Sequence, residues 1–377
     1  MDCLFAMREP PAGLGLNGST LQRVVGNQII DRANAQVEAA RKAGNPALEA
    51  SALLDLGRVY AAAGLTVEAS GAFEDAVTPA RAASDQPLLA KALANAGSQL
   101  HLAGQPGEAL ELTEQALVEF RGLGDKRNEL RTLANCAAIQ QALGLAADAA
   151  VTAEKAITVA RELDDRELLY PLHSLHADLL TGLERATQAR SARRQALTAA
   201  RKTDNTEFIS TQLEALGELL LIDEAHDEAL KLYFEANALH TKRGDVAGTY
   251  RTLLQQGLLY QHLGRWAEAE SALRGALELC QQLSDAPHEP YIQASLASAH
   301  LGTGKFEAAA TLATAAAEGY RRSEDPIGVG RALASLGQAQ EQLGDDASAR
   351  RNFEEALGML SGVDPAGEDA LRSLLAL

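Results

Sequence analysis

Hydrophobic residues recur at the spacing of an α-helix through most of this chain. In residues 265–283 (RWAEAESALRGALELCQQL), Ala269, Leu273, Ala276 and Cys280 come three or four positions apart, with charged and polar residues between them. That period places the apolar side chains on one face of a helix. No stretch sustains the alternation of apolar and polar residues that indicates a β-strand. The pattern therefore predicts an all-α protein.

The helical pattern itself repeats every 40 residues. Alanine occupies two positions, seven apart, in each of eight successive repeats. The first set is Ala69, Ala109, Ala149, Ala189, Ala229, Ala269, Ala309 and Ala349, and the second is Ala76, Ala116, Ala156, Ala196, Ala236, Ala276, Ala316 and Ala356. A fixed period is the signature of a fold in which each unit packs on its neighbours. We therefore expect eight similar units over residues 45–363.

Each unit carries a helix start and a helix stop. Asp or Asn stands at positions 45, 85, 125, 165, 205, 245, 285 and 325, where its side chain can accept a hydrogen bond from a first-turn N–H. Gly stands at 64, 104, 144, 264, 304 and 344, which suits a helix end with positive φ. Glu184 and Glu224 replace this glycine in the fourth and fifth units. Each unit is thus predicted to hold helix A, from cap to stop, and helix B, from stop to the next cap.

Helix A also carries a small residue at one register. These residues are Gly57, Gly97, Ala137, Ala177, Gly217, Gly257, Ala297 and Gly337. Glycine inside a helix costs about 1 kcal/mol relative to alanine. Close contact between helices A and B is the obvious compensation, because a larger side chain would force them apart.

These features resemble the tetratricopeptide repeat (TPR). The resemblance rests on the small residue in helix A, the glycine between helices and the paired alanines of helix B. Leu56–Tyr60 (LGRVY) and Gln256–Glu270 (QGLLYQHLGRWAEAE) carry it most clearly. The 40-residue unit, especially Ile327–Asp345, is similar to that of spindle-orientation adaptors that bind G-protein regulators. The resemblance implies a right-handed α-solenoid of about eight helix-turn-helix units whose A helices line a concave groove, and it implies protein binding without catalysis.

Both ends depart from the repeat. Residues 1–18 contain prolines and glycines and are expected to be flexible. Residues 19–44 match helix B of a degenerate unit and should form an N-terminal capping helix, and residues 364–377 should form a short C-terminal one. Solenoids need such caps because an end unit otherwise exposes its apolar face. The apolar ending SLLAL either packs on the last unit or joins two copies of the chain in a homo-oligomer.

Composition limits the function. The 377 residues carry a formal net charge of −17, which argues against nucleic acid because phosphate contacts need a basic face. We interpret the local basic residues Arg190, Arg193, Arg194, Arg201 and Lys202 as a solvated helix face. Three distant cysteines indicate a reducing compartment. Without a signal-like start or a long apolar run, the chain is expected to be cytoplasmic and not bound to a membrane.

Motifs for catalysis and cofactors are weak. GLGLNG at residues 13–18 matches a dinucleotide fingerprint by letters but lacks the βαβ context that gives it meaning. His173, His176 and Asp178 could be proposed as a metal site, but they fall in packed registers without a further ligand cluster, so we interpret the histidines as core residues. We expect no enzyme activity, no cofactor and no metal.

The groove residues are predicted by register. The position six residues after each cap holds Ser51, Lys91, Arg131, Pro171, Thr211, Arg251, Tyr291 and Arg331, and the position four residues later holds Asp55, Asn95, Asn135, Leu175, Ala215, Gln255, Ser295 and Ser335. Residues four apart share a helix face. An amide can pair with a peptide backbone and an arginine with a carboxylate. The predicted peptide-binding residues are Lys91, Asn95, Arg131, Asn135, Arg251, Gln255 and Arg331.

An alternative is that each basic residue pairs with its own cap, six residues earlier. Asp165 and Asp285, however, are present where Pro171 and Tyr291 offer no charge. The main hypothesis is an adaptor that binds an extended, acidic peptide segment in its groove. The two other hypotheses are a regulator that senses a signalling peptide and a structural protein that self-associates.

Overall fold

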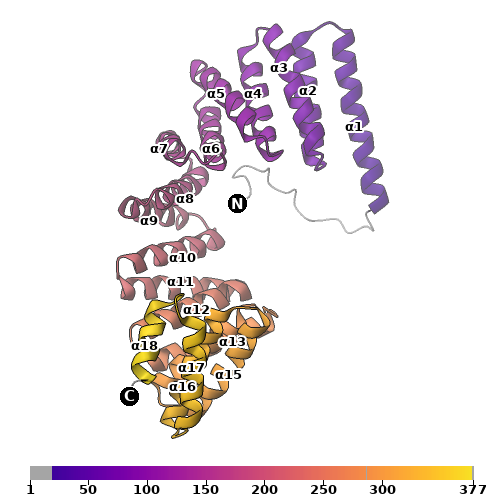
Figure 1. Ribbon diagram of the computed structural model, residues 1–377. Coiled ribbons are helices and arrows are strands. Elements are labelled where there is room, and N and C mark those ends of the chain that lie inside the picture. The colour runs from indigo at the N-terminus through magenta and orange to yellow at the C-terminus, as the bar shows by residue number, and fades with distance from the viewer. Residues whose placement is uncertain (1–18, 286, 376–377) are drawn as a thin grey trace. The chain divides into compact units, whose positions relative to one another are not determined.

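The computed structural model describes residues 19–285 and 287–375, with side chains from residue 28 onward. Over these residues the chain forms α-helices and no β-strand (Figure 1). The helices are α1 (Ser19–Lys42), α2 (Pro46–Ala62), α3 (Thr66–Ala82), α4 (Gln86–Leu102), α5 (Pro106–Gly122), α6 (Lys126–Ala142), α7 (Ala146–Glu162), α8 (Arg166–Gly182), α9 (Ala186–Ala200), α10 (Thr206–Ile222), α11 (His226–Arg243), α12 (Val246–His262), α13 (Trp266–Gln282), α14 (Glu289–Gly302), α15 (Phe306–Arg322), α16 (Pro326–Gln342), α17 (Asp346–Leu360) and α18 (Pro365–Leu375). Even-numbered helices from α2 to α16 are the predicted A helices.

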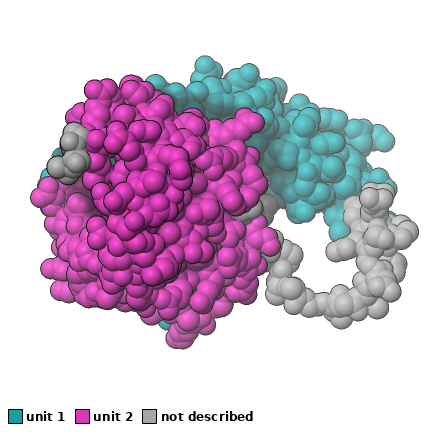
Figure 2. Space-filling view, turned by 60° about the horizontal axis from the view of Figure 1, so that its bottom comes forward, with its two compact units in different colours: residues 1–204 teal, residues 205–377 magenta. Residues whose placement is uncertain are grey.

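The chain divides into two compact units (Figure 2). Unit 1 comprises residues 1–204, and unit 2 comprises residues 205–377. Within each unit, helices pack against their neighbours in chain order, as expected of helix-turn-helix repeats stacked in a solenoid. The division follows the fourth repeat, at the end of α9. This helix ends at Ala200, whereas α7 continues two residues beyond the equivalent Ala160, to Glu162.

Local signals place most helix starts as predicted. The side chains at positions 45, 85, 125, 165, 205, 245 and 325 each accept a hydrogen bond from a first-turn backbone N–H. The prediction for Asp285 is wrong, because α14 starts at Glu289 and the Asp285 carboxylate contacts His288 instead. Pro290 falls in the first turn of α14, where proline is tolerated.

The predicted stops also have the expected backbone. Each stop glycine has φ between 68° and 81°. Glu184 and Glu224 adopt the same left-handed conformation, with φ of 58° and 57°. The fourth and fifth units therefore keep the turn between helices A and B despite losing the glycine.

The small residues explain how the helices of a pair approach each other. All sixteen repeat alanines have at most 2% of their surface exposed. A Cβ atom added to Gly57 would lie 2.5 Å from the ring of Phe73 on α3. This distance is too short for two non-bonded carbon atoms. The close packing predicted for the helix A register is thus confirmed, and the core is built from alanine and leucine with few aromatic rings.

Capping helices lie at both ends of the described part. The helix α1 packs on α2. At the other end, Leu371 of α18 is buried in the same apolar cluster as Phe353 and Leu360, and Leu374 and Leu375 pack against that cluster. Most of the apolar ending is therefore used within the last repeat. The segment predicted to be flexible (residues 1–18), which contains GLGLNG, lies outside the described residues.

Candidate functional site

The predicted groove residues occupy an accessible face of the A helices. The first residue of each predicted pair is exposed and the second is half-buried, as for Lys91 and Asn95 on α4 and for Arg131 and Asn135 on α6. Pro171 and Leu175 are buried, so α8 does not extend this pattern. We call the exposed registers the A face.

The structure brings four of the predicted residues onto adjacent helices of unit 1. The helix α4, which carries Lys91 and Asn95, contacts both α2 and α6, and α6 carries Arg131 and Asn135. Within the described part of the chain, Lys91 and Arg131 make no ion pair, and neither amide makes a side-chain hydrogen bond. These donors and acceptors are therefore available to another molecule.

Nearby carboxylates do not neutralise this part of the A face. Asp55 on α2 is paired with Arg58 of its own helix, at 2.6 Å between Oδ1 and Nη1. Glu129 on α6 is buried and paired with Arg121 at 2.9 Å and with Lys126 at 3.1 Å. Both acids therefore have cationic partners of their own, and neither forms an ion pair with Lys91 or Arg131.

The sequence prediction missed Arg127. This residue lies four positions before Arg131 on α6, is exposed, and makes no ion pair among the described residues. Residues four apart share a helix face, so Arg127, Arg131 and Asn135 form one polar stripe. The same spacing that paired Arg131 with Asn135 could have found it in the sequence.

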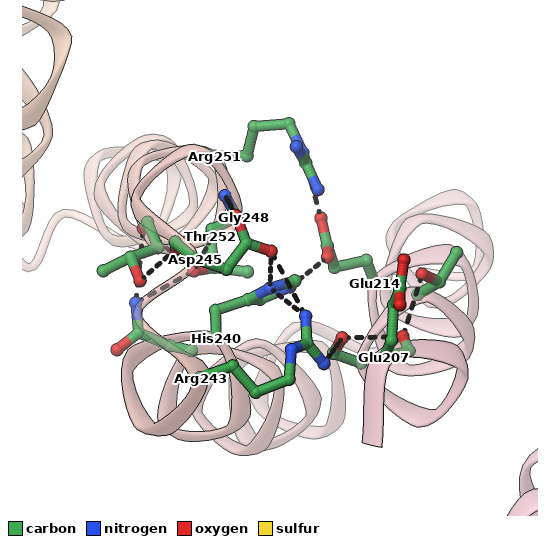
Figure 3. Close-up of polar contacts among 12 residues, drawn as sticks. Glu207, Glu214, His240, Arg243, Asp245, Gly248, Arg251 and Thr252 are labelled. Carbon is green, nitrogen blue, oxygen red and sulfur yellow. Dashed lines mark hydrogen bonds and ion pairs between the residues drawn. The ribbon is translucent and has the colours of Figure 1, made fainter. Parts of the chain in front are cut away.

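In unit 2, Arg251 is already engaged. Its Nε lies 3.4 Å from Oε2 of Glu214 on α10. The other oxygen of Glu214 lies 2.6 Å from Nε2 of the buried His240, whose Nδ1 lies 2.7 Å from Asp245 (Figure 3). Arg243 completes the cluster, at 3.2 Å from Asp245. The charge of Arg251 is thus balanced within the protein.

The His240 cluster ties together three successive helices. Asp245 caps α12 by accepting from the N–H of Gly248, and this backbone bond, together with His240 and Arg243, lowers the pKa of its carboxyl. Glu214 supplies the link to α10. Glu214 was identifiable from the sequence, because the same register holds Leu54, Ala94, Ala134, Ser174, Leu254, Ala294 and Ala334 in the other repeats.

Arg331 is also paired, and Gln255 remains half-buried without a side-chain hydrogen bond among the described residues. The Nε of Arg331 lies 3.0 Å from Oδ2 of Asp364, next to α18. The N–H of Gly367, followed by Arg331, lowers the pKa of the Asp364 carboxyl. The candidate site is consequently best developed on α4 and α6 of unit 1.

The alternative pairing with the helix caps is not what the structure forms. No ion pair joins Lys91 to Asp85 or Arg131 to Asp125 within the described residues. In unit 2, Asp245 pairs with His240 and Arg243 rather than with Arg251. The caps serve the backbone, and the basic residues of the A face are independent of them.

Other reactive side chains are buried. Burial raises the pKa of the Cys136 thiol to about 12 and, aided by Asp285 and Glu289, raises the pKa of Cys280, so both thiols are protonated near neutral pH. No group of three or more His, Cys, Asp or Glu side chains that could hold a metal gathers in the described ranges. Every helix of the described part lacks either the length or the apolarity needed to cross a bilayer.

Sequence comparison gives two partial matches. The profile of the tetratricopeptide repeat matches residues 248–322. The profile of anaphase-promoting complex subunit 5 matches residues 28–98 and 125–183. Comparison with curated proteins gave no match.

Solved structures of the same fold cover most of the chain. A STAND-family signal-transduction ATPase with a tetratricopeptide repeat sensor from Pyrococcus horikoshii has a TM-score of 0.63 at 14% identity, over 92% of this chain and 55% of that protein. The chain therefore spans about half of that relative. The apo form of RapI has a TM-score of 0.52 at 14% identity, over 81% of this chain and 99% of RapI.

A third structure is the C-terminal part of a TPR repeat-containing protein from Cytophaga hutchinsonii. It has a TM-score of 0.53 at 12% identity, over 73% of this chain and 98% of that structure. The paired helices, the 40-residue registers and these matches agree. The chain therefore has the tetratricopeptide repeat fold.

Proposed function

We propose that the chain is a non-catalytic, cytoplasmic interaction scaffold that binds an extended acidic peptide segment on the A face of unit 1. The contact residues are Lys91 and Asn95 on α4 and Arg131 and Asn135 on α6, with Arg127 added by the structure. The two basic residues attract carboxylates, and each amide can both donate to and accept from a peptide backbone.

One observation carries the proposal. Lys91 and Arg131 have no anionic partner among the described residues, whereas Arg251 and Arg331, at the same register, do. On both α4 and α6, a basic residue without an anionic partner lies four positions before an amide without a side-chain hydrogen bond, among the described residues. The registers that hold the fold together are nearly uniform, and this difference between units supports binding on the A face of unit 1.

The test is peptide binding by fluorescence anisotropy with the full chain. A labelled, unstructured Glu/Ser peptide should bind, and the same peptide with Gln in place of Glu should bind at least about tenfold more weakly, the equivalent of about 1.4 kcal/mol. Affinity should fall as salt rises, because the charges involved are exposed. Equal binding of both peptides would remove the acidic preference.

Matched variants locate the site. Lys91→Ala and Arg131→Ala should weaken binding, and so should Asn95→Ala and Asn135→Ala. Arg251→Ala and Arg331→Ala remove charge at the same register in unit 2 and should leave affinity nearly unchanged. If the unit 2 variants lose as much affinity as the unit 1 variants, the placement on α4 and α6 is wrong.

A sensing role is the second candidate. The observation that favours it is the likeness, over 92% of the chain, to a protein described as having a tetratricopeptide repeat sensor, together with the division into two compact units. A sensor should change shape when the acidic peptide binds. Small-angle X-ray scattering of the free and peptide-bound chain would then differ, whereas a static scaffold would give the same profile.

A further inference from the structure

A recess lined by cationic side chains lies within unit 1, away from Lys91 and Arg131. It is formed by the end of α7, by α8 and by α9, and has a volume of about 510 Å³. Four basic side chains line it: Arg161, Arg190, Arg194 and Lys202. No aspartate or glutamate is among the described residues that line it. In a chain with a net charge of −17, such a concentration of positive charge is unusual.

The helix α9 differs from its counterparts in charge. At the position of Arg194, the first three repeats and the last have glutamate: Glu74, Glu114, Glu154 and Glu354. The first turn of α9 also lacks an acidic residue, whereas α3, α5, α7, α11, α13, α15 and α17 each have at least one. The earlier interpretation of this stretch as a solvated face is incomplete, because Arg193 is buried and bonded to Asp178 and Ser174.

Among the described residues, the polar partners of the Arg161 side chain are neutral groups. Its Nη2 donates to Oε1 of Gln195 at 2.9 Å and lies 3.4 Å from Nε2 of His173. The corresponding pair in the last repeats is Arg321 and Glu355, at 2.8 Å. An amide thus replaces a carboxylate beside Arg161, so that the arginine is positioned without being neutralised.

His173 is consistent with a positive environment. The ring is buried at a register that holds leucine in most repeats, and burial, followed by the charge of Arg161 and by His176, lowers its pKa to about 4. The neutral ring can accept a hydrogen bond from Arg161. Neither partner of Arg161 therefore contributes negative charge.

We propose that this recess binds a small phosphate-bearing molecule. Guanidinium groups bind phosphate oxygens with paired hydrogen bonds, and the hydroxyls of Thr187 and Ser191 line the same recess and can donate to further oxygens. A volume of this size is in the range of small-molecule sites. Arg190 and Arg194 make other polar contacts, so Arg161 and Lys202 are the cations whose charge the ligand would neutralise.

The probe is pyrophosphate, titrated into the full chain by isothermal calorimetry at constant ionic strength. One binding site is expected. Gln195→Glu supplies the carboxylate that Glu355 provides to Arg321, so it should preserve folding and weaken pyrophosphate binding at least about tenfold, as should Arg161→Gln. Two controls alter the equivalent pair in unit 2: Glu355→Gln makes the opposite change to Gln195→Glu, and Arg321→Gln makes the same change as Arg161→Gln. Both should leave pyrophosphate binding unchanged.

Three results would overturn the proposal. The first two are no binding of pyrophosphate at about millimolar concentration and equal losses in the Gln195→Glu and Glu355→Gln proteins. If citrate at the same ionic strength binds as tightly as pyrophosphate, the site does not select phosphate and the assignment is wrong. Lys91→Ala should not affect pyrophosphate binding, so this test and the peptide test can fail independently.

Discussion

Oε2 of Glu214 lies 3.4 Å from Nε of Arg251, which is 37 residues later in the chain, while Oε1 of the same carboxylate lies 2.6 Å from Nε2 of His240. One half-buried acid thereby contacts both an exposed arginine of the A face and a buried imidazole. This ion pair is a difference between the two units, because Lys91 and Arg131 of unit 1 have no such partner among the described residues.

Removal of that carboxylate should destabilise unit 2. Glu214→Gln replaces one of the two carboxylates that contact the buried His240 with a neutral amide, and loss of a charged hydrogen bond in such a site costs about 1–3 kcal/mol. Urea denaturation followed by circular dichroism would measure the loss. The control Asp55→Asn breaks an exposed pair with Arg58 and should change stability by less than about 1 kcal/mol. Equal effects would mean that the His240 cluster contributes nothing special.

Substitution of the helix A glycines should overpack the helix pair. The Cβ of Gly57→Ala would lie 2.5 Å from Phe73, so the variant should lose about 1–3 kcal/mol of stability. Gly71→Ala is the matched control, because Gly71 is in α3 with no atom within 4 Å of an added Cβ, and it should gain up to about 1 kcal/mol. The substitution Phe73→Leu should partly rescue Gly57→Ala. Failure of this rescue would argue against the contact as the cause.

The two non-glycine stops should be improvable. Glu184 and Glu224 have φ near 58°, a conformation that costs an L-residue about 1–2 kcal/mol. Glu184→Gly should therefore raise the melting temperature, with a net gain of about 0.5 kcal/mol after the entropy cost of glycine. Gly264→Ala reverses the change in unit 2 and should lower the melting temperature. A destabilised Glu184→Gly protein would indicate that the Glu184 side chain has a role of its own.

His173 predicts a loss of stability in acid. Burial, and then Arg161 and His176, lower its pKa from 6.5 to about 4, so the unfolded chain takes up a proton at a higher pH than the folded one. The contribution of the neutral His173 to stability is present in full above pH 6.5 and is lost as the pH falls towards 4. We expect a loss of about 2 kcal/mol, which is less than the full pKa shift implies because solvent screens part of the effect. His173→Leu, which restores the usual residue of that register, should flatten this dependence in urea unfolding at pH 7 and pH 5. Identical slopes in the two proteins would contradict the assignment.

Removal of residues 364–377 distinguishes a cap from an interface. Leu371 is buried against the last repeat, so the truncated chain should expose that cluster, lose stability and associate more strongly in light scattering. If α18 instead joins two copies, the truncation would convert an oligomer into a monomer. Leu371→Ala should cost about 2–5 kcal/mol and provides the same test without deleting the helix.

The repeat made most of the fold predictable. Helix starts depend on one side chain and a few N–H groups next to it, and stops depend on one residue with positive φ, so both are readable locally. The error at Asp285 arose because α14 begins four residues after that position, at Glu289, with Pro290 in its first turn. The contact between Gly57 and Phe73 was predictable in kind, because a costly glycine inside a helix needs a neighbour, but the identity of the neighbour was not.

The sequence by itself determined the helices and their 40-residue repeat, because these follow from periodicity and short-range chemistry, and the resemblance to the tetratricopeptide repeat implied which registers form the A face. Only the tertiary structure decided which basic residues on that face are free. The partners of Arg251 and Arg331 lie 37 and 33 residues away, on elements brought close by packing, and no register rule specifies such pairs. The recess beside Arg161 also depends on a contact between residues far apart in the chain. Arg161 meets the amide of Gln195 on α9, whereas Arg321, at the equivalent position, meets the carboxylate of Glu355.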